Sequence, residues 1–226
     1  PIDKPARHRQ DHPLPSRPTR PPVTADPPPD AADHAAKKAR IKAVKDKLYA
    51  SKTIEKGLLI VHTGSGKGKS TAAWGLAMRC LGHGLKLGVV QFVKGRRETG
   101  ERKLLERFPE LVTIKVMGEG FTWETQDRAR DVAAAEAAWA EALRMLQDAE
   151  LHLVVLDELN IVLRYEYLSL DRVLAGLAAR RPGLHVVVTG RNAKPELIAA
   201  ADLVTEMTLV KHPFRAGVKG QLGVEW

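Results

Sequence analysis

The sequence predicts an α/β fold, with a mostly parallel sheet of about six strands flanked by helices. From Gly57 onward, short apolar runs of strand length alternate with helix-like runs. Such alternation is typical of parallel strands joined by crossover helices that cover both faces of one sheet. A glycine-rich turn between the first strand and the first helix adds a phosphate-binding loop to this architecture.

Each element follows from its own stretch of sequence. Apolar runs predict strands over Leu58–His62, Lys86–Phe92, Val112–Val116, Leu151–Asp157, His185–Thr189 and Leu203–Met207. Helices are predicted over Lys69–Leu81, Thr99–Arg107, Gln126–Gln147, Ser169–Ala179 and Pro195–Ala200. Ligands of such sheets bind at the carboxyl ends of the strands, so the residues after each strand are the candidates for a site.

The N-terminal residues differ from this pattern. Residues 1–30 hold ten of the 14 prolines and almost no large apolar side chains, so we expect a disordered proline-rich tail. Residues 31–53 are rich in Ala, Lys and Arg, and they predict a basic helix. That helix either packs on its own domain or covers a ligand as a lid. Residues 54–226 are predicted to form the catalytic domain.

The net charge of +9 raises the question of a nucleic-acid partner. Residues 1–52 contain 12 Lys and Arg against 6 Asp and Glu, so most of the excess lies outside the predicted catalytic domain. Aromatic residues are sparse and are not interleaved with this basic stretch. Nucleic acid is therefore not the expected partner, and a binding module confined to the N-terminal region remains the alternative.

The composition also bears on the compartment. The sequence has no apolar run long enough to span a membrane, and its N-terminus lacks the apolar core of a signal peptide. Its single cysteine, Cys80, cannot form an internal disulfide. We expect a cytoplasmic protein in a reducing setting, with no membrane partner.

The most informative stretch is T-G-S-G-K-G-K-S-T, between the first predicted strand and the first predicted helix. A strand, a glycine-rich turn and Lys-Ser at the start of a helix are the layout of a phosphate-binding loop. Lys69 supplies a charge to phosphate oxygens and Ser70 a hydroxyl to Mg²⁺. The expected nucleotide-binding residues are Thr63, Gly64, Ser65, Gly66, Lys67, Gly68, Lys69, Ser70 and Thr71.

This loop departs from the usual pattern, and it makes the predicted fold P-loop NTPase-like (RecA-like). The usual pattern has a glycine, four residues and then Gly-Lys-Ser or Gly-Lys-Thr. Here Thr63 occupies the place of that first glycine, and Gly64 comes one residue late. The loop is therefore a variant whose geometry can differ from that of an ordinary ATPase.

A second signal is the run L-H-L-V-V-L-D-E, a buried strand that ends in two acids. A carboxylate at this place can hold Mg²⁺ opposite Ser70, directly or through water. The spacing does not distinguish Asp157 from Glu158, so both are candidate metal ligands.

Three further segments follow predicted strands. A glycine-flanked loop carries Phe121 and Trp123, which either plug the core or form an apolar wall for a large, flat ligand. The next carries Arg191, which either reaches a phosphate or a substrate carboxamide or is a surface arginine without a ligand. The basic segment Val210–Gln221 is either a solvated loop or part of the ligand site.

Taken together, these segments resemble the ATP:corrinoid adenosyltransferases of the cobalamin-synthesis type. The resemblance spans residues 57–226, extends more loosely to the helix from Asp33, and includes the variant phosphate loop. Ser70 stands where many members have Thr, and the Pro1–Asp30 tail departs from the family. The stretches that carry the resemblance are Thr63–Thr71, Gly88–Gly95, Gly120–Thr125, Val155–Leu159, Val188–Arg191, Lys211–Phe214 and Ala216–Lys219.

The resemblance implies that a corrinoid reduced to Co(I) attacks the 5′-carbon of ATP, which lies reversed relative to other P-loop enzymes. A cobalt–carbon bond forms and triphosphate leaves, in adenosylcobalamin synthesis or salvage. Lys69, the backbone N–H groups of Gly66–Lys69, and Mg²⁺ (or Mn²⁺) held by Ser70 and Glu158 would neutralise the departing triphosphate.

The resemblance also implies partners and further catalytic residues. Phe121 and Trp123 would fill the lower face of the corrinoid, so that a flavoprotein can reduce its cobalt. A homodimer is implied as well. The catalytic residues would then be Lys69, Glu158, Phe121 and Trp123. The alternative function is a P-loop ATPase or kinase that releases ADP, with Glu158 polarising a water.

Overall fold

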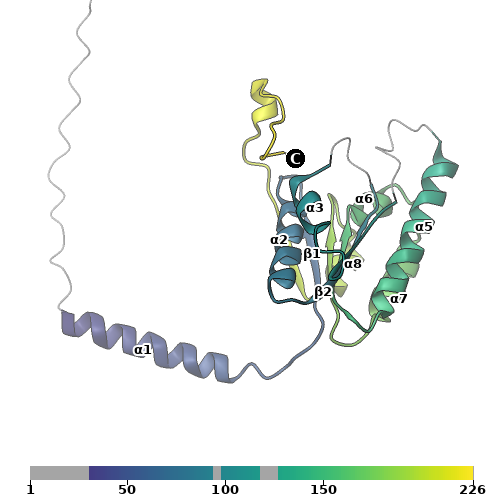
Figure 1. The fold of residues 1–226 in the computed structure, drawn as a ribbon. Helices are drawn as coiled ribbons and strands as arrows, with labels where there is room; N and C mark the ends of the chain where they lie inside the picture. Colours follow the sequence, from purple (N-terminus) through teal and green to yellow (C-terminus); the bar gives the residue numbers. More distant parts are fainter. Residues whose placement is uncertain (1–30, 94–97, 118–126, 226) are drawn as a thin grey trace, which may run out of the picture. The chain divides into compact units, whose positions relative to one another are not determined.

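The computed structural model describes residues 31–93, 98–117 and 127–225 (Figure 1). The chain divides into two units, Pro1–Thr53 and Ile54–Trp226. In the first unit the described element is helix α1 (Ala31–Ala50), which carries the Ala-, Lys- and Arg-rich sequence. The predicted proline-rich tail and the loop with Phe121 and Trp123 lie outside the described residues.

The second unit is built on a sheet of six strands in which all neighbouring pairs are parallel. Its order is β3-β2-β4-β5-β1-β6, so β5 separates the strand before the phosphate loop from the strand that ends in two acids. The predicted P-loop α/β fold is confirmed. The strands are β1 (Leu59–Thr63), β2 (Lys86–Gln91), β3 (Val112–Val116), β4 (Leu151–Asp157), β5 (His185–Thr189) and β6 (Leu203–Glu206).

Helices cover both faces of this sheet because successive strand residues point to opposite sides. On one face, Ile60, Val89 and Val155 pack with Trp74 of α2. On the other face, Val61, Val90 and Val154 pack with Trp139 of α5 and Leu177 of α7. The helices are α2 (Lys69–Gly82), α3 (Gly100–Leu105), α5 (Arg128–Gln147), α6 (Leu159–Arg164), α7 (Leu170–Ala178) and α8 (Pro195–Ala200), followed by the 3₁₀ helix η1 (Pro213–Ala216).

Among the described residues, the structure adds one α-helix and the short 3₁₀ helix η1 to those predicted from the sequence. Helix α6 follows β4 directly, and its residues Leu159, Val162 and Leu163 are buried in the core. Its six residues are too few to show a helical period. Among the described residues, no helix has both the length and the apolar character needed to cross a membrane.

Strand β6 is the least covered part of the sheet. All four of its residues are exposed, including Leu203 at 48% and Val204 at 37%. Among the described strands it pairs on one side only, with β1. The carboxyl end of β6 therefore lies beside the phosphate loop that follows β1.

Candidate nucleotide and metal site

The turn between β1 and α2 is closely packed on the segment after β6. Gly64 and Gly68 have φ angles of 97° and 105°, which favour glycine. A Cβ atom on Gly64 or Gly66 would lie 2.5 Å or 2.7 Å from the carbonyl oxygen of Met207. The backbone N–H of Gly66, expected among the phosphate donors, donates to that same oxygen at 2.6 Å. The first half of the loop is thus fixed by Met207, directly after β6, rather than open on all sides.

Lys69 is folded back into this loop. Its side chain is only 6% exposed, and Nζ donates to the carbonyl oxygens of Gly64 (3.0 Å) and Gly66 (2.5 Å). Burial lowers its pKa; Glu158 opposes this effect, whereas Arg191 and Lys67 add to it. The ammonium group therefore lies inside the loop, where phosphate oxygens can replace the two carbonyls as its partners.

The two acids at the end of β4 have different surroundings. Asp157 is 4% exposed and accepts hydrogen bonds on both oxygens, from Thr189 Oγ1 (2.7 Å) and from Gln91 Nε2 (3.1 Å). The backbone N–H of Glu158 donates to Thr189 Oγ1 at 2.9 Å. Because both oxygens of Asp157 are engaged, the arrangement favours Glu158 as the metal ligand.

Glu158 occupies an unusual backbone position and has an unusual charge environment. Its φ of 62° is left-handed, which for this residue type is a strained conformation of the kind found at functional sites. Burial and then the charge of Asp157 raise the pKa of Glu158 to about 7, against the opposing effect of Lys69 and Arg191. A cation beside this carboxylate would stabilise its charged form.

A metal at this place needs more than protein acids. Among the described residues there is no group of three or more His, Cys, Asp and Glu side chains that would hold an ion. Ser70 is half-buried in the first turn of α2, and Glu158 directly follows β4; each carries an oxygen of the kind that Mg²⁺ accepts as a ligand. Such an incomplete protein shell is typical of Mg²⁺ bound together with a nucleotide.

Arg191 lies in a short loop after β5. Its charge acts on both Lys69 and Glu158, which places the three side chains in one electrostatic site. The carbonyl of Gly190 accepts from Asn160 Nδ2 at 2.9 Å, and the N–H of Ala193 donates to Thr63 Oγ1 at 3.0 Å. These loop contacts were not predicted, because nothing in the sequence pattern pairs a strand end with a loop so distant along the chain.

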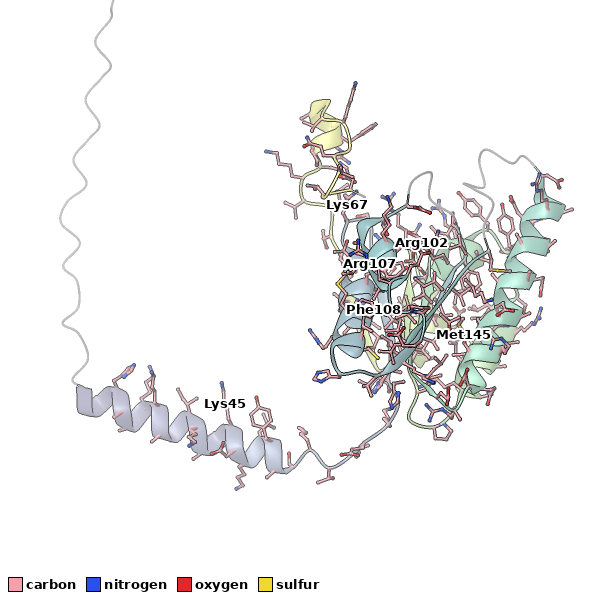
Figure 2. The ribbon with its side chains drawn as sticks, viewed as in Figure 1. Lys45, Lys67, Arg102, Arg107, Phe108 and Met145 are labelled. Atoms are coloured by element: carbon pink, nitrogen blue, oxygen red, sulfur yellow. The ribbon has the colours of Figure 1, made fainter. Side chains whose placement is uncertain are left out.

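The C-terminal segment also reaches the phosphate loop. Lys67, on the exposed side of the loop, forms an ion pair with Glu225. Figure 2 shows Lys67 beside the yellow C-terminal segment. Glu225 was not predicted as a site residue, because its surroundings in the sequence carry no signal for this contact.

The predicted site residues differ in their surroundings. Lys69, Glu158 and Arg191 interact electrostatically, and Thr63 accepts a hydrogen bond from the loop that carries Arg191. Ser65 and Thr71 are exposed on the loop and on α2, and neither side chain forms a hydrogen bond with another described residue. The predicted aromatic pair lies outside the described residues.

Comparison with known proteins gives a consistent result. The sequence model of the family described as ATP:corrinoid adenosyltransferase BtuR/CobO/CobP matches residues 55–226. A corrinoid adenosyltransferase of Pseudomonas aeruginosa is 59% identical over 193 residues, which cover 85% of this chain and 95% of the relative. Corrinoid adenosyltransferases of Sinorhizobium sp and Escherichia coli K12 are 55% and 47% identical, over 87% and 83% of this chain and 93% and 94% of their own lengths. Among solved structures, the flagellar accessory protein FlaH from Methanocaldococcus jannaschii has a TM-score of 0.45 at 10% identity, over 69% of this chain and 73% of that chain.

Proposed function

The chain belongs to the ATP:corrinoid adenosyltransferase family BtuR/CobO/CobP, and on that basis we propose that it joins the 5′-deoxyadenosyl group of ATP to the Co(I) centre of a reduced corrinoid. It is a transferase, and triphosphate is the leaving group. The observation that supports this proposal most directly is the family match over residues 55–226, which includes the phosphate loop, Asp157 at the end of β4 and the following Glu158. An ATPase or kinase function is not favoured, because the relatives are corrinoid adenosyltransferases.

The site has the charges that a departing triphosphate requires. Lys69 lies inside the loop, with Arg191 acting on the same site. Both are proposed to bind phosphate oxygens as negative charge develops on them. Mg²⁺ (or Mn²⁺) would be held by Ser70 and Glu158 and would supply further positive charge there. Asp157, with both oxygens hydrogen-bonded, is proposed to hold Thr189 and Gln91 in place rather than to contact the metal.

No protein group is needed as a general base in this reaction, because Co(I) is itself the nucleophile. Catalysis then consists of positioning the two substrates, excluding water and stabilising the leaving group. The fixed first half of the loop, held by Met207, contributes to the positioning. The N–H groups after Gly66 are proposed to be the phosphate donors of the loop, since that of Gly66 is already engaged.

Phe121 and Trp123 are proposed to fill the lower face of the corrinoid, as the family resemblance implies. A cobalt centre that lacks a lower axial ligand is easier to reduce from Co(II). We expect Phe121→Ala or Trp123→Ala to lower activity with Co(II) corrinoid plus reductant far more than activity with chemically prepared Co(I). Equal losses with both substrates would contradict this role.

Two further proposals come from the family resemblance: the enzyme forms a homodimer, and it receives electrons for cobalt reduction from a flavoprotein. A third, that it acts in the cytoplasm, comes from the composition of the sequence. Sedimentation of the purified chain tests the dimer, and adenosylation driven by a reduced flavoprotein in place of a chemical reductant tests the electron donor.

The decisive experiment identifies the products. The protein is mixed with Co(I) cobalamin, ATP and Mg²⁺ under strong reduction. We expect the corrin spectrum to change to that of an alkylated corrinoid and triphosphate to accumulate in equal amount. Release of ADP and orthophosphate, with an unchanged corrin spectrum, would instead support the hydrolase or kinase alternative.

A further inference from the structure

The loop that carries Arg191 is held at both ends by side chains, one from α6 and one from the end of β1. We call Gly190–Ala193 the Arg191 loop. At its start, the Gly190 carbonyl accepts from Asn160 Nδ2 at 2.9 Å, and at its end the Ala193 N–H donates to Thr63 Oγ1 at 3.0 Å. The two contacts come from opposite sides, because β5 lies between β4 and β1 in the sheet. Arg191 is thus an exposed side chain on a backbone that is fixed on both sides.

The start of the loop is also packed against Glu158. Gly190 has a φ of 125°, and a Cβ atom there would lie 2.8 Å from Asn160 Cβ and 3.1 Å from Glu158 Oε2. Glycine is therefore required at this position. The close contact means that any shift of the loop changes the position of Arg191 relative to the Glu158 carboxylate.

Asn160 carries a polar group where an apolar one would be expected. The residue is 1% exposed, and its Oδ1 finds no hydrogen-bond donor within the part of the chain that the structure describes. An unpaired buried acceptor destabilises a fold, so an amide is a poor choice for a residue that only fills the core. Its Nδ2 donates to the Gly190 carbonyl, so the amide group of Asn160 holds the start of the Arg191 loop.

Thr63 departs from the usual phosphate-loop pattern at the place where a glycine is expected. The structure gives this departure a physical reason. Thr63 is 7% exposed, and its hydroxyl oxygen accepts the hydrogen bond of Ala193. A glycine could not form this bond, so the variant loop gains a link to the Arg191 loop.

We propose that Thr63 and Asn160 are positioning residues that together hold the Arg191 loop so that the guanidinium group can bind the phosphates of ATP. This inference rests on the proposed function, in which Arg191 binds phosphate. Neither positioning residue needs to touch the nucleotide, because both act through the backbone of the loop.

The test is a double-mutant cycle on ATP affinity, measured by calorimetry with Mg²⁺ and without corrinoid. Thr63→Val removes the hydroxyl at nearly constant volume, and Asn160→Ala removes the amide. Each is expected to weaken ATP binding about threefold to tenfold, the range for one lost hydrogen bond. In an Arg191→Ala background the same substitutions are expected to change affinity by less than about twofold.

Two matched controls separate positioning from general damage to the fold. Thr63→Ser keeps the hydroxyl and is expected to bind ATP within about twofold of the wild type. Gln147, the last residue of α5, donates a similar amide-to-carbonyl hydrogen bond from its Nε2 to Ala179. Gln147→Ala removes this bond and is expected to leave ATP affinity unchanged. Thermal unfolding of every variant shows which of them remain folded, and the Thr63 pair alone decides the outcome if Asn160→Ala does not fold.

Equal losses of affinity in the presence and absence of Arg191 would overturn the proposal, and so would an Arg191→Ala variant that binds ATP normally. Either result leaves the proposed reaction intact if the wild type still forms triphosphate and the alkylated corrinoid. Conversely, a wild type that releases ADP would refute the reaction, while the coupling of Thr63 and Asn160 to Arg191 would still stand.

Discussion

Lys69 is the residue on which we expect nucleotide binding to depend most directly. It is a buried cation whose partners are backbone carbonyls rather than an acid, so its charge is available to an incoming anion. We expect Lys69→Ala to reduce turnover at least about a hundredfold, by analogy with the loss of one preorganised electrostatic donor. Adenosylation of Co(I) cobalamin is the assay, with Lys86→Ala as control, because Lys86 pairs with Glu150 on the exposed surface. Near-normal turnover of Lys69→Ala would exclude the assigned role.

Glu158 should make metal-dependent binding sensitive to pH. Its pKa is raised from 4.5 to about 7, so a proton competes with the metal for the carboxylate below that pH. Affinity for ATP with Mg²⁺ is expected to fall by up to about tenfold per pH unit as the pH drops below 7. Glu158→Gln should bind weakly and show no such slope. An unchanged slope in the variant would assign the titration to another group.

The raised pKa of Glu158 also makes the free energy of unfolding depend on pH. The dependence has the opposite sign from that of an ion-paired acid, whose pKa is lowered on folding. The folded protein binds this proton more tightly than the unfolded chain does, because the pKa is higher in the folded state. The wild type without ligand should therefore lose stability relative to Glu158→Gln as the pH rises from about 4.5 to about 7, and the difference should then level off. Denaturant unfolding at several pH values measures this difference.

At the scale of elements, the C-terminal segment places an acid beside the phosphate loop. Glu225 pairs with Lys67, so a carboxylate stands where phosphate oxygens are expected to approach. We expect Glu225→Gln to tighten ATP binding about twofold to fivefold at low salt, and less at high salt because the pair is partly exposed. Glu150→Gln, which removes the exposed partner of Lys86, serves as the control. Weaker binding by Glu225→Gln would instead show that the acid orients Lys67 productively.

Helices and strands could be predicted from the sequence more completely than the contacts between their side chains. Four strands or helices have the predicted bounds, Val112–Val116, Leu151–Asp157, His185–Thr189 and Pro195–Ala200, because each is a distinct run between turn residues. Helix α6 was missed since it continues the apolar run of β4 with only a left-handed Glu158 between them. The hydrogen bonds that engage both oxygens of Asp157 were also out of reach, because they come from Thr189 and Gln91, which approach only when β5 and β2 flank β4.

For the whole molecule, the distribution of charge predicts which part would attract polyanions. Most of the excess of Lys and Arg lies in residues 1–52, whereas the sheet, both core clusters and the nucleotide site belong to Ile54–Trp226. Deleting residues 1–52 is expected to abolish weak, salt-sensitive binding to DNA and to leave ATP affinity unchanged. Filter binding and calorimetry on the two proteins measure these effects. DNA binding that survives the deletion would place a polyanion site on the second unit.

The open border of the sheet has a practical consequence. Among the described strands, β6 presents apolar side chains and one row of peptide groups with no strand partner, and such a border can template the addition of further strands. Concentrated solutions would be expected to begin to aggregate there. Met207, directly after that strand, also fixes the turn around Lys69. Pairing of another chain with β6 would therefore be expected to lower activity before the core unfolds.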